Sequence, residues 1–346
     1  MNESFVNTVL TFTKGTAIEK IESIQSLWSG YGDISRYQVL NGVADTVVIK
    51  HVKLPDQTSD QKTNHPRGWN TSLSHKRKIK SYDVECVWYN KYSQRCNDAC
   101  RVPSCFGVKQ LEGEFLMVLE DLDTQGFAVR KTSATFEDMK LCLKWLANFH
   151  CQFLFYNNVS SDSTNTLTAQ TLTGQYKDLW ETGCYWHLET RPDELEALSD
   201  IPLKNAASKI DRLLKQTSYQ TLVHGDAKLA NFCFSETGND VAAVDFQYVG
   251  MGCGMKDVAY FIGSCLDSEG CEKHADDLLD YYFESLSQAM LSQRHDVNFD
   301  DLETQWRPLF DVAWADFHRF LKGWSPDHWK IHPYSERITQ KVLNSL

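Results

Sequence analysis

The chain has 346 residues, of which 42% are hydrophobic and 23% are charged. These values are typical of globular proteins that bury a sizeable core, and they exclude a disordered or fibrous chain. The 35 basic and 46 acidic residues give a formal net charge of −11, which disfavours nonspecific binding to nucleic acid or to an anionic membrane. A ligand that carries phosphate would therefore need a local cluster of positive charge.

Length and hydropathy limit the architecture further. At about 150 residues per domain, the length predicts two domains or one domain divided into lobes. No apolar run approaches the roughly 20 residues of a membrane-spanning helix, and the first residues lack the regions of a signal peptide. We therefore expect a cytoplasmic protein with no membrane partner, and we expect its eleven cysteines to be reduced thiols.

The first third of the chain predicts the start of a small β-sheet. Two strands, 24–28 and 36–40, flank a glycine-containing turn. An Asn-Gly pair, which is a strong hairpin signal, then precedes a β-branched strand at 46–52 that contains Lys50. This strand is expected to be buried.

The following residues predict a helix and the rest of the sheet. Residues 55–75 have no periodicity and predict a long, mobile insertion, whereas 76–92 have helical spacing and contain Glu85. Two further strands are expected at 102–109 and 115–119.

The remainder of the chain predicts mainly helices. An amphipathic helix is expected at 136–155, a Ser/Thr/Asn-rich connector at 157–175, and a helix start near Pro192. The C-terminal region is rich in aromatic residues, and their helical spacing favours core packing. A wall for an acceptor ring or a cage for a cationic acceptor is the alternative interpretation.

Two apolar segments each lead into a carboxylate. The first ends at Val223 and is followed by Asp226 and Asn231, and the second, 241–244, is followed by Asp245. Because a turn signal lies between them, we expect the two segments to be neighbouring strands of a short hairpin, which would bring the three side chains together. Two carboxylates and an amide are hard oxygen ligands that suit Mg²⁺ with bound phosphate.

This pattern fits phosphoryl transfer, which mainly needs a positioned acceptor hydroxyl and neutralised phosphate charge. Asp226 would orient the hydroxyl and take its proton, Lys228 would contact the γ-phosphate, and Asn231 with Asp245 would hold the metal. The alternative is that these are ordinary turn residues. A strand lysine and a helical glutamate come before the two carboxylate segments, and this order favours the functional interpretation.

The motifs resemble those of the kinase-like phosphotransferases. His-Gly-Asp at 224–226, with Asn231, resembles their catalytic loop, and Asp-Phe-Gln at 245–247 takes the place of the Asp-Phe-Gly of protein kinases. The chain resembles the aminoglycoside phosphotransferase and choline kinase superfamily, and within it the ecdysteroid kinase-like, or CHK kinase-like, group.

The resemblance implies an α+β, protein-kinase-like fold with two lobes. Residues 1–122 would form a nucleotide-binding lobe with a small antiparallel sheet, and 123–346 a larger, mostly helical catalytic and acceptor-binding lobe. The residues assigned to the nucleotide are Lys50, Glu85, Glu120 and Leu122. The residues assigned to the acceptor, from the aromatic cluster and its polar neighbours, are Trp186, Asp316, Arg319 and Trp324.

The expected activity is transfer of the γ-phosphate of ATP, with Mg²⁺, to a hydroxyl of a small choline-, aminoglycoside-, sugar- or sterol-like acceptor. A nucleotide-binding pseudokinase with a regulatory role is the first alternative, and a protein kinase is the second. No Ala-Pro-Glu follows Asp245, so a peptide-docking segment is not expected. The expected partners are ATP and the acceptor, without nucleic acid, and the sequence carries no signal for an oligomeric state.

Overall fold

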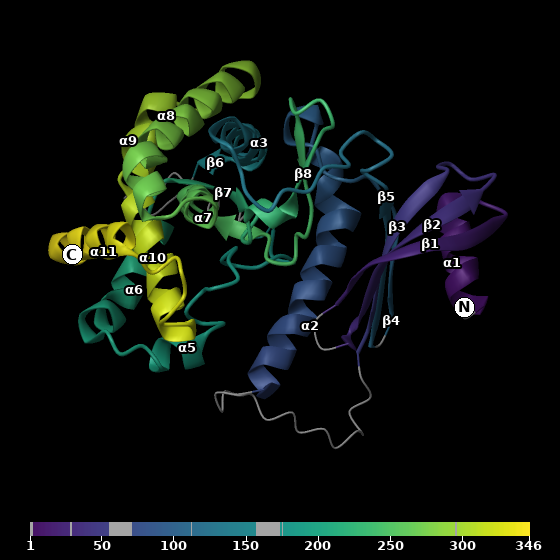
Figure 1. The fold of residues 1–346 in the computed structure, drawn as a ribbon, viewed down its shortest axis with the longest axis horizontal. Coiled ribbons are helices and arrows are strands. Elements are labelled where there is room, and N and C mark those ends of the chain that lie inside the picture. Colours follow the sequence, from purple (N-terminus) through teal and green to yellow (C-terminus); the bar gives the residue numbers. More distant parts are fainter. Residues whose placement is uncertain are drawn as a thin grey trace. The chain divides into compact units, whose positions relative to one another are not determined.

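The computed structural model describes residues 3–27, 30–54, 71–111, 113–156, 174, 176–294 and 296–346. Contacts divide the chain into two units. The first comprises Met1–Val129 and Cys233–Val244, and the second Arg130–Phe232 and Asp245–Leu346. The first unit is built on an antiparallel sheet and the second mainly from helices, so the predicted α+β class is confirmed (Figure 1).

A five-stranded sheet in the order β1-β2-β3-β5-β4 forms the centre of the first unit, and every neighbouring pair is antiparallel. The strands are β1 (Ala17–Ser26), β2 (Gly32–Leu40), β3 (Thr46–Lys53), β4 (Cys105–Leu111) and β5 (Glu114–Glu120). The strands expected at 36–40, 46–52 and 115–119 are confirmed. The first strand begins earlier than expected, because Ala17–Ser26 pairs along the whole of β2.

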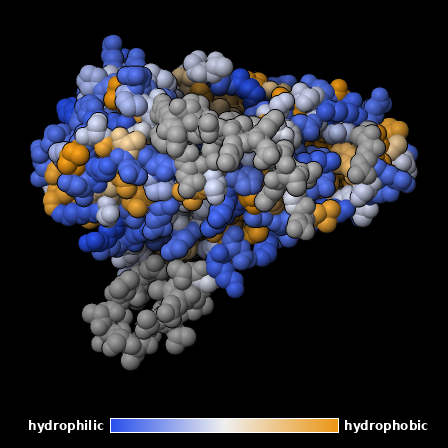
Figure 2. Space-filling model, turned by 90° about the horizontal axis from the view of Figure 1, so that it is seen from below, coloured by the Kyte–Doolittle hydropathy of each residue, from blue (hydrophilic) through white to orange (hydrophobic). Residues whose placement is uncertain are grey.

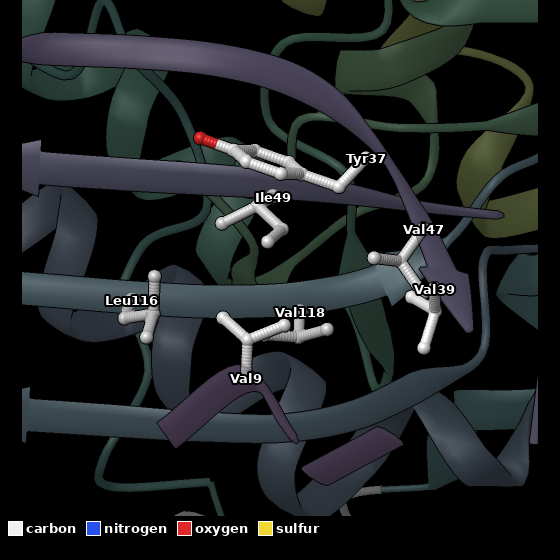
Figure 3. Packing of buried hydrophobic residues seen from close by; sticks show 7 residues of the cluster. All are labelled: Val9, Tyr37, Val39, Val47, Ile49, Leu116 and Val118. Atoms are coloured by element: carbon white, nitrogen blue, oxygen red, sulfur yellow. The ribbon is translucent and has the colours of Figure 1, made fainter. Parts of the chain in front are cut away.

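One face of this sheet is covered by the N-terminal helix α1 (Glu3–Thr13). Val9 of this helix is fully buried against Val47 and Ile49 of β3 and against Val118 of β5 (Figure 3). Because strand side chains alternate between faces, these odd-numbered positions of β3 point towards α1. Their neighbours in β3 must therefore face the opposite side.

The opposite face is covered by helix α2 (Thr71–Val87), whose Tyr82 ring lies 5.8 Å from that of Phe115 in β5. A π-helical turn, Trp88–Tyr92, continues from it. The sequence placed residues 71–75 in an insertion, but they form the first turn of this helix, and residues 55–70 lie outside the described part of the chain.

A short hairpin from later in the chain completes the first unit. It pairs β8 (Phe232–Phe234) with β9 (Val241–Ala243). Cys233 and Ala242 pack with Leu122 in one buried cluster. The Ala243 N–H also donates a 3.0 Å hydrogen bond to the Arg101 carbonyl.

The second unit is mostly helical. Its longer helices are α3 (Phe136–Phe153), α6 (Ile201–Lys215), α7 (Met255–Cys265), α8 (Ser268–Gln293), α10 (Leu309–Trp324) and α11 (Pro333–Ser345). Helix α3 packs on α8, and α10 packs on α6, α7 and α11. The predicted helix start near Pro192 is confirmed by the short helix α5 (Pro192–Glu196), and helix α9 (Phe299–Trp306) precedes α10.

A three-stranded sheet in the second unit has the order β10-β7-β6. It joins β10 (Gly250–Gly252), β7 (Tyr219–Val223) and β6 (Phe155–Tyr156). The expected hairpin between the two carboxylate-bearing segments is therefore wrong, because β7 pairs with β10 and β9 pairs with β8. The turn lies where the sequence indicated, but it closes a shorter hairpin.

Within the described residues, no helix has both the length and the apolar character needed to cross a bilayer. Hydrophilic residues predominate on the face shown in Figure 2, and hydrophobic ones are scattered among them. All eleven cysteines are free thiols.

Candidate active site

In the first unit, Lys50 and Glu85 form a buried ion pair. The Lys50 ammonium donates to Glu85 Oε2 at 2.6 Å, and the two side chains are 5% and 1% exposed. Lys50 lies on the face of β3 opposite Val47 and Ile49, which is the face covered by α2. The other nearby carboxylate, Glu114, instead pairs with His51 at 2.5 Å.

The two remaining residues assigned to the nucleotide have partners within the first unit. The Glu120 carboxylate accepts hydrogen bonds from the Arg101 guanidinium at 2.7 Å and from the Ser104 N–H at 2.9 Å. Leu122 is buried, and its carbonyl accepts hydrogen bonds from the backbone of Gln125 and Phe127. The Glu120 side chain therefore fastens β5 to the chain that precedes β4.

In the second unit, the loop after β7 turns sharply at Gly225. Its φ is +77°, and a Cβ at this position would lie 2.2 Å from the carbonyl oxygen of Tyr248. Only glycine fits both the left-handed backbone and this close approach. The turn sets the direction of Asp226, the next residue in the chain.

Asp257, in the first turn of α7, accepts hydrogen bonds from the backbone of this loop. Its two carboxylate oxygens accept the His224 N–H at 2.6 Å and the Gly225 N–H at 3.0 Å. His150 Nε2 lies 3.2 Å from the same carboxylate, and His150 Nδ1 lies 2.8 Å from the Tyr282 hydroxyl. Since all of these groups are buried, each depends on the others for its hydrogen bonds.

Asp226 is surrounded by donors. Its Oδ2 accepts from Lys228 Nζ at 2.9 Å and from Asn231 Nδ2 at 3.2 Å, and its Oδ1 accepts from the Tyr260 hydroxyl at 3.1 Å. The Asn231 amide also bonds the Asp226 carbonyl at 2.8 Å. Burial, followed by the charge of Asp226, raises the pKa of Tyr260, so this hydroxyl remains a donor near neutral pH.

Asp245 belongs to the same charged group. Burial disfavours the Lys228 ammonium, but Asp226 and then Asp245 more than compensate, and the pKa of Lys228 is raised. The Asp245 backbone is left-handed, with φ of +68°, and its Oδ1 accepts from Gln247 Nε2 at 2.7 Å. The structure thus gathers Asp226, Lys228 and Asn231 by direct contacts and Asp245 by its effect on the lysine.

The carboxylate and amide oxygens of this group are donors that suit Mg²⁺. Carboxylate and amide oxygens are the groups that Mg²⁺ prefers, together with phosphate oxygens and water. No group of three or more His, Cys, Asp or Glu side chains able to hold a metal occurs among the described residues. Asn231 and Asp245 supply an amide and a carboxylate oxygen, which are donors of the kind that such an ion takes.

Three of the four residues assigned to the acceptor lie together in the interior of the second unit. The Trp186 indole donates to Asp316 Oδ2 at 3.1 Å, and the Arg319 guanidinium donates to Asp316 Oδ1 at 2.9 Å. Each is at most 2% exposed. Trp324 lies apart from them, stacked on Phe320 and 38% exposed.

Sequence reasoning gave no role to Asp257 or Tyr260. The available signal was their spacing, because residues three apart in a helix share one face. In the structure this face of α7 presents Asp257 to the backbone of the loop after β7 and Tyr260 to Asp226.

The sequence was compared with protein families and with curated proteins. The family model of the ecdysteroid kinase-like family matches residues 75–294, well over half of the chain. No curated protein matches the sequence.

A solved structure shows the same fold at low sequence identity, and two further kinases are similar to the chain at lower TM-scores. The amicoumacin kinase hAmiN, in complex with AMP-PNP, Ca²⁺ and Ami, is 12% identical with a TM-score of 0.53, and the match covers 100% of this chain and 93% of that one. A Plasmodium vivax ethanolamine kinase is 13% identical, with a TM-score of 0.47, covering 95% and 84%. The choline kinase LicA from Streptococcus pneumoniae is 14% identical, with a TM-score of 0.44, covering 98% and 97%. The match to the amicoumacin kinase confirms the predicted kinase-like fold.

Proposed function

Because the chain belongs to the ecdysteroid kinase-like family, we propose that it is a phosphotransferase that moves the γ-phosphate of ATP to a hydroxyl of a small molecule. One observation carries the proposal most directly. The Asp226 carboxylate, set by a glycine turn, accepts from Lys228, Asn231 and Tyr260. The buried Asp257 accepts from two backbone N–H groups of this turn and so fixes its conformation.

In the proposed reaction, Asp226 accepts the proton of the acceptor hydroxyl as the hydroxyl oxygen bonds to the γ-phosphorus. The bond between this phosphorus and the bridging oxygen of ADP breaks, and ADP leaves with that electron pair. Lys228, beside Asp226, offsets negative charge on the transferred phosphoryl group. The products are ADP and a phosphate monoester, and Asp226 releases its proton to water.

Lys50 is proposed to bind the nucleotide phosphates. Its buried partner Glu85 fixes the position of the ammonium group at 2.6 Å, so little side-chain entropy is lost when an anion binds. Asn231 and Asp245 are proposed to hold Mg²⁺. When bound, this ion would neutralise phosphate charge and orient the phosphate oxygens.

The test is transfer of labelled γ-phosphate from ATP to a panel of sugar, amino-alcohol and sterol acceptors, with peptides included. We expect a small acceptor to be phosphorylated and Asp226→Asn to lower kcat by about 10²–10⁴-fold. Asp277→Asn, an exposed aspartate on α8, is the matched control and should leave kcat unchanged.

Other results would support the alternatives. Binding of Mg²⁺-ATP without transfer to any acceptor, and unchanged by Asp226→Asn, would identify a pseudokinase. Faster phosphorylation of peptides than of small alcohols would identify a protein kinase.

A further inference from the structure

Lys330, on the loop between α10 and α11, places its ammonium group among three aromatic rings. Its Nζ lies 5.1 Å from the ring centroid of Tyr260, 5.4 Å from that of Phe317 and 5.5 Å from that of Trp329. Distances below about 6 Å are those at which a cation is attracted to the face of an aromatic ring. The three rings, from three separate segments, form a cage, and the chain's own ammonium group fills it.

The cage adjoins Asp226. Tyr260 is shared between them, because its hydroxyl donates to Asp226 Oδ1 at 3.1 Å while its ring contacts Lys330. Burial lowers the pKa of Lys330 to about 8, the charges of Cys265 and Asp226 oppose this shift, and Lys228 reinforces it. Lys330 and Asp226 thus both contact the Tyr260 side chain.

The backbone around Lys330 is held on both sides. The Lys330 N–H donates to His328 Nδ1 at 3.2 Å, and the Lys330 carbonyl accepts from the Ser335 hydroxyl at 3.0 Å. Ser335, in α11, is itself bonded by the Trp314 indole of α10 at 3.2 Å. The loop is therefore fixed to both flanking helices, and the ammonium group is positioned before any ligand binds.

We propose that Lys330 is a specificity-determining residue, whose ammonium group occupies the aromatic cage beside Asp226 and excludes cationic acceptors. The inference rests on the proposed phosphotransferase function. An aromatic cage is the usual recognition site for a quaternary ammonium group, and here the Lys330 ammonium group occupies the cage. A cationic acceptor with its hydroxyl at Asp226 would also meet like charge from both Lys228 and Lys330.

The exposure of the groups around Lys330 supports its role in specificity. Asp226 and Tyr260 are 6% and 3% exposed, whereas Trp329 is 55% exposed, and Lys330 contacts both aromatic residues. The Lys330 ammonium group therefore contacts both the buried ring whose hydroxyl bonds Asp226 and a ring exposed at the surface. An uncharged acceptor at this position would meet no like charge, whereas a cation would.

The first arm of the test compares kcat/KM for choline-like and uncharged hydroxyl acceptors in the full chain. The wild type should prefer the uncharged acceptor, and Lys330→Ala should shift the ratio towards the cation by at least about tenfold. Lys330→Arg keeps the charge and should keep the preference, and the KM for ATP should not change in either variant. Lys273→Met, on the exposed face of α8, is the control for loss of one positive charge.

The second arm measures binding of tetramethylammonium by tryptophan fluorescence and does not depend on turnover. Lys330→Ala empties the cage and should bind this cation, whereas the wild type and Lys330→Arg should not. Equal binding by the wild type and Lys330→Ala, or a wild-type preference for cationic acceptors, would overturn the inference. If no acceptor is phosphorylated by any variant, the proposed function fails, while the binding arm still decides whether Lys330 closes the cage.

Discussion

The two units hold their buried charged groups in different ways. In the first unit, Lys50 pairs with Glu85, and both residues come from neighbouring elements of one sheet-and-helix layer. Asp226 in the second unit is fixed by a glycine turn, by three donors and, through the loop backbone, by Asp257. The two charged side chains of an ion pair can be replaced together by apolar side chains. A network that includes backbone N–H groups cannot be replaced in this way, because the backbone donors remain. This contrast can be tested.

The largest effect is expected when the pair is broken. Lys50→Met removes the ammonium group that pairs with the buried Glu85 carboxylate and should lower the free energy of unfolding by about 3–5 kcal/mol. The double variant Lys50→Met/Glu85→Met removes both charges and should recover most of that loss, although nucleotide binding stays weak. Urea unfolding and calorimetry with ATP measure the two effects. A double variant no more stable than the single one would show that the loss does not come from the Glu85 carboxylate alone.

The second prediction concerns Asp257. Asp257→Ala leaves the buried N–H groups of His224 and Gly225 without an acceptor and should cost about 2–4 kcal/mol of unfolding free energy. Combining it with His150→Phe should not restore stability, because the backbone donors remain. Urea unfolding of the single and double variants would test this, and full recovery in the double variant would remove the contrast between the units.

The third prediction is a pH dependence in the second unit. Burial lowers the pKa of His318 to about 4, and the nearby Glu336 carboxylate, 3.4 Å away, only partly opposes this. Between pH 6.5 and 4 the unfolded chain binds more protons at this position, so stability should fall as the pH falls through this window, by about 1–3 kcal/mol. Thermal unfolding against pH should show a shallower fall in His318→Gln. His274→Gln, on α8, should keep the wild-type slope.

The smallest effect is expected at Tyr260. Tyr260→Phe removes one of the three donors to Asp226 and keeps the ring that contacts Lys330. Because one hydrogen bond contributes about 1 kcal/mol, kcat should fall by roughly 3- to 10-fold with little change in the KM for ATP. Tyr281→Phe is the control for loss of a tyrosine hydroxyl on a neighbouring helix. An unchanged kcat would show that Lys228 and Asn231 are sufficient to orient the carboxylate.

The sequence predicted the first unit better than the second, for a physical reason. The β-branched run of β3 and the helical spacing of α2 are local patterns that placed Lys50 on a strand and Glu85 on a helix, and the family resemblance paired the two residues. The pairing of β7 with β10 was missed because Gly250–Gly252 has no strand-forming side chains and is held by its partner strand alone. Helix α1 was also missed, although Phe5, Val9 and Phe12 have helical spacing.

The residues of the catalytic loop were predicted together from their motif, but their surroundings were not. Trp329 precedes Lys330 in the chain, but nothing in the order of residues indicates that Tyr260 of α7 and Phe317 of α10 also lie around Lys330. The aromatic C-terminal region was interpreted as core or as a cage for a ligand. It contains both features, but the cation in the cage is part of the chain.

The hairpin Cys233–Val244 has a consequence for any attempt to dissect this protein. Its flanking residues belong to the second unit, so neither unit is a continuous stretch of chain. A fragment that stops at Val129 would leave Leu122 uncovered, and a fragment that starts at Arg130 would carry an apolar ribbon without its partner. Expression trials should therefore retain the whole polypeptide, and a deletion of the ribbon should leave both halves prone to aggregate.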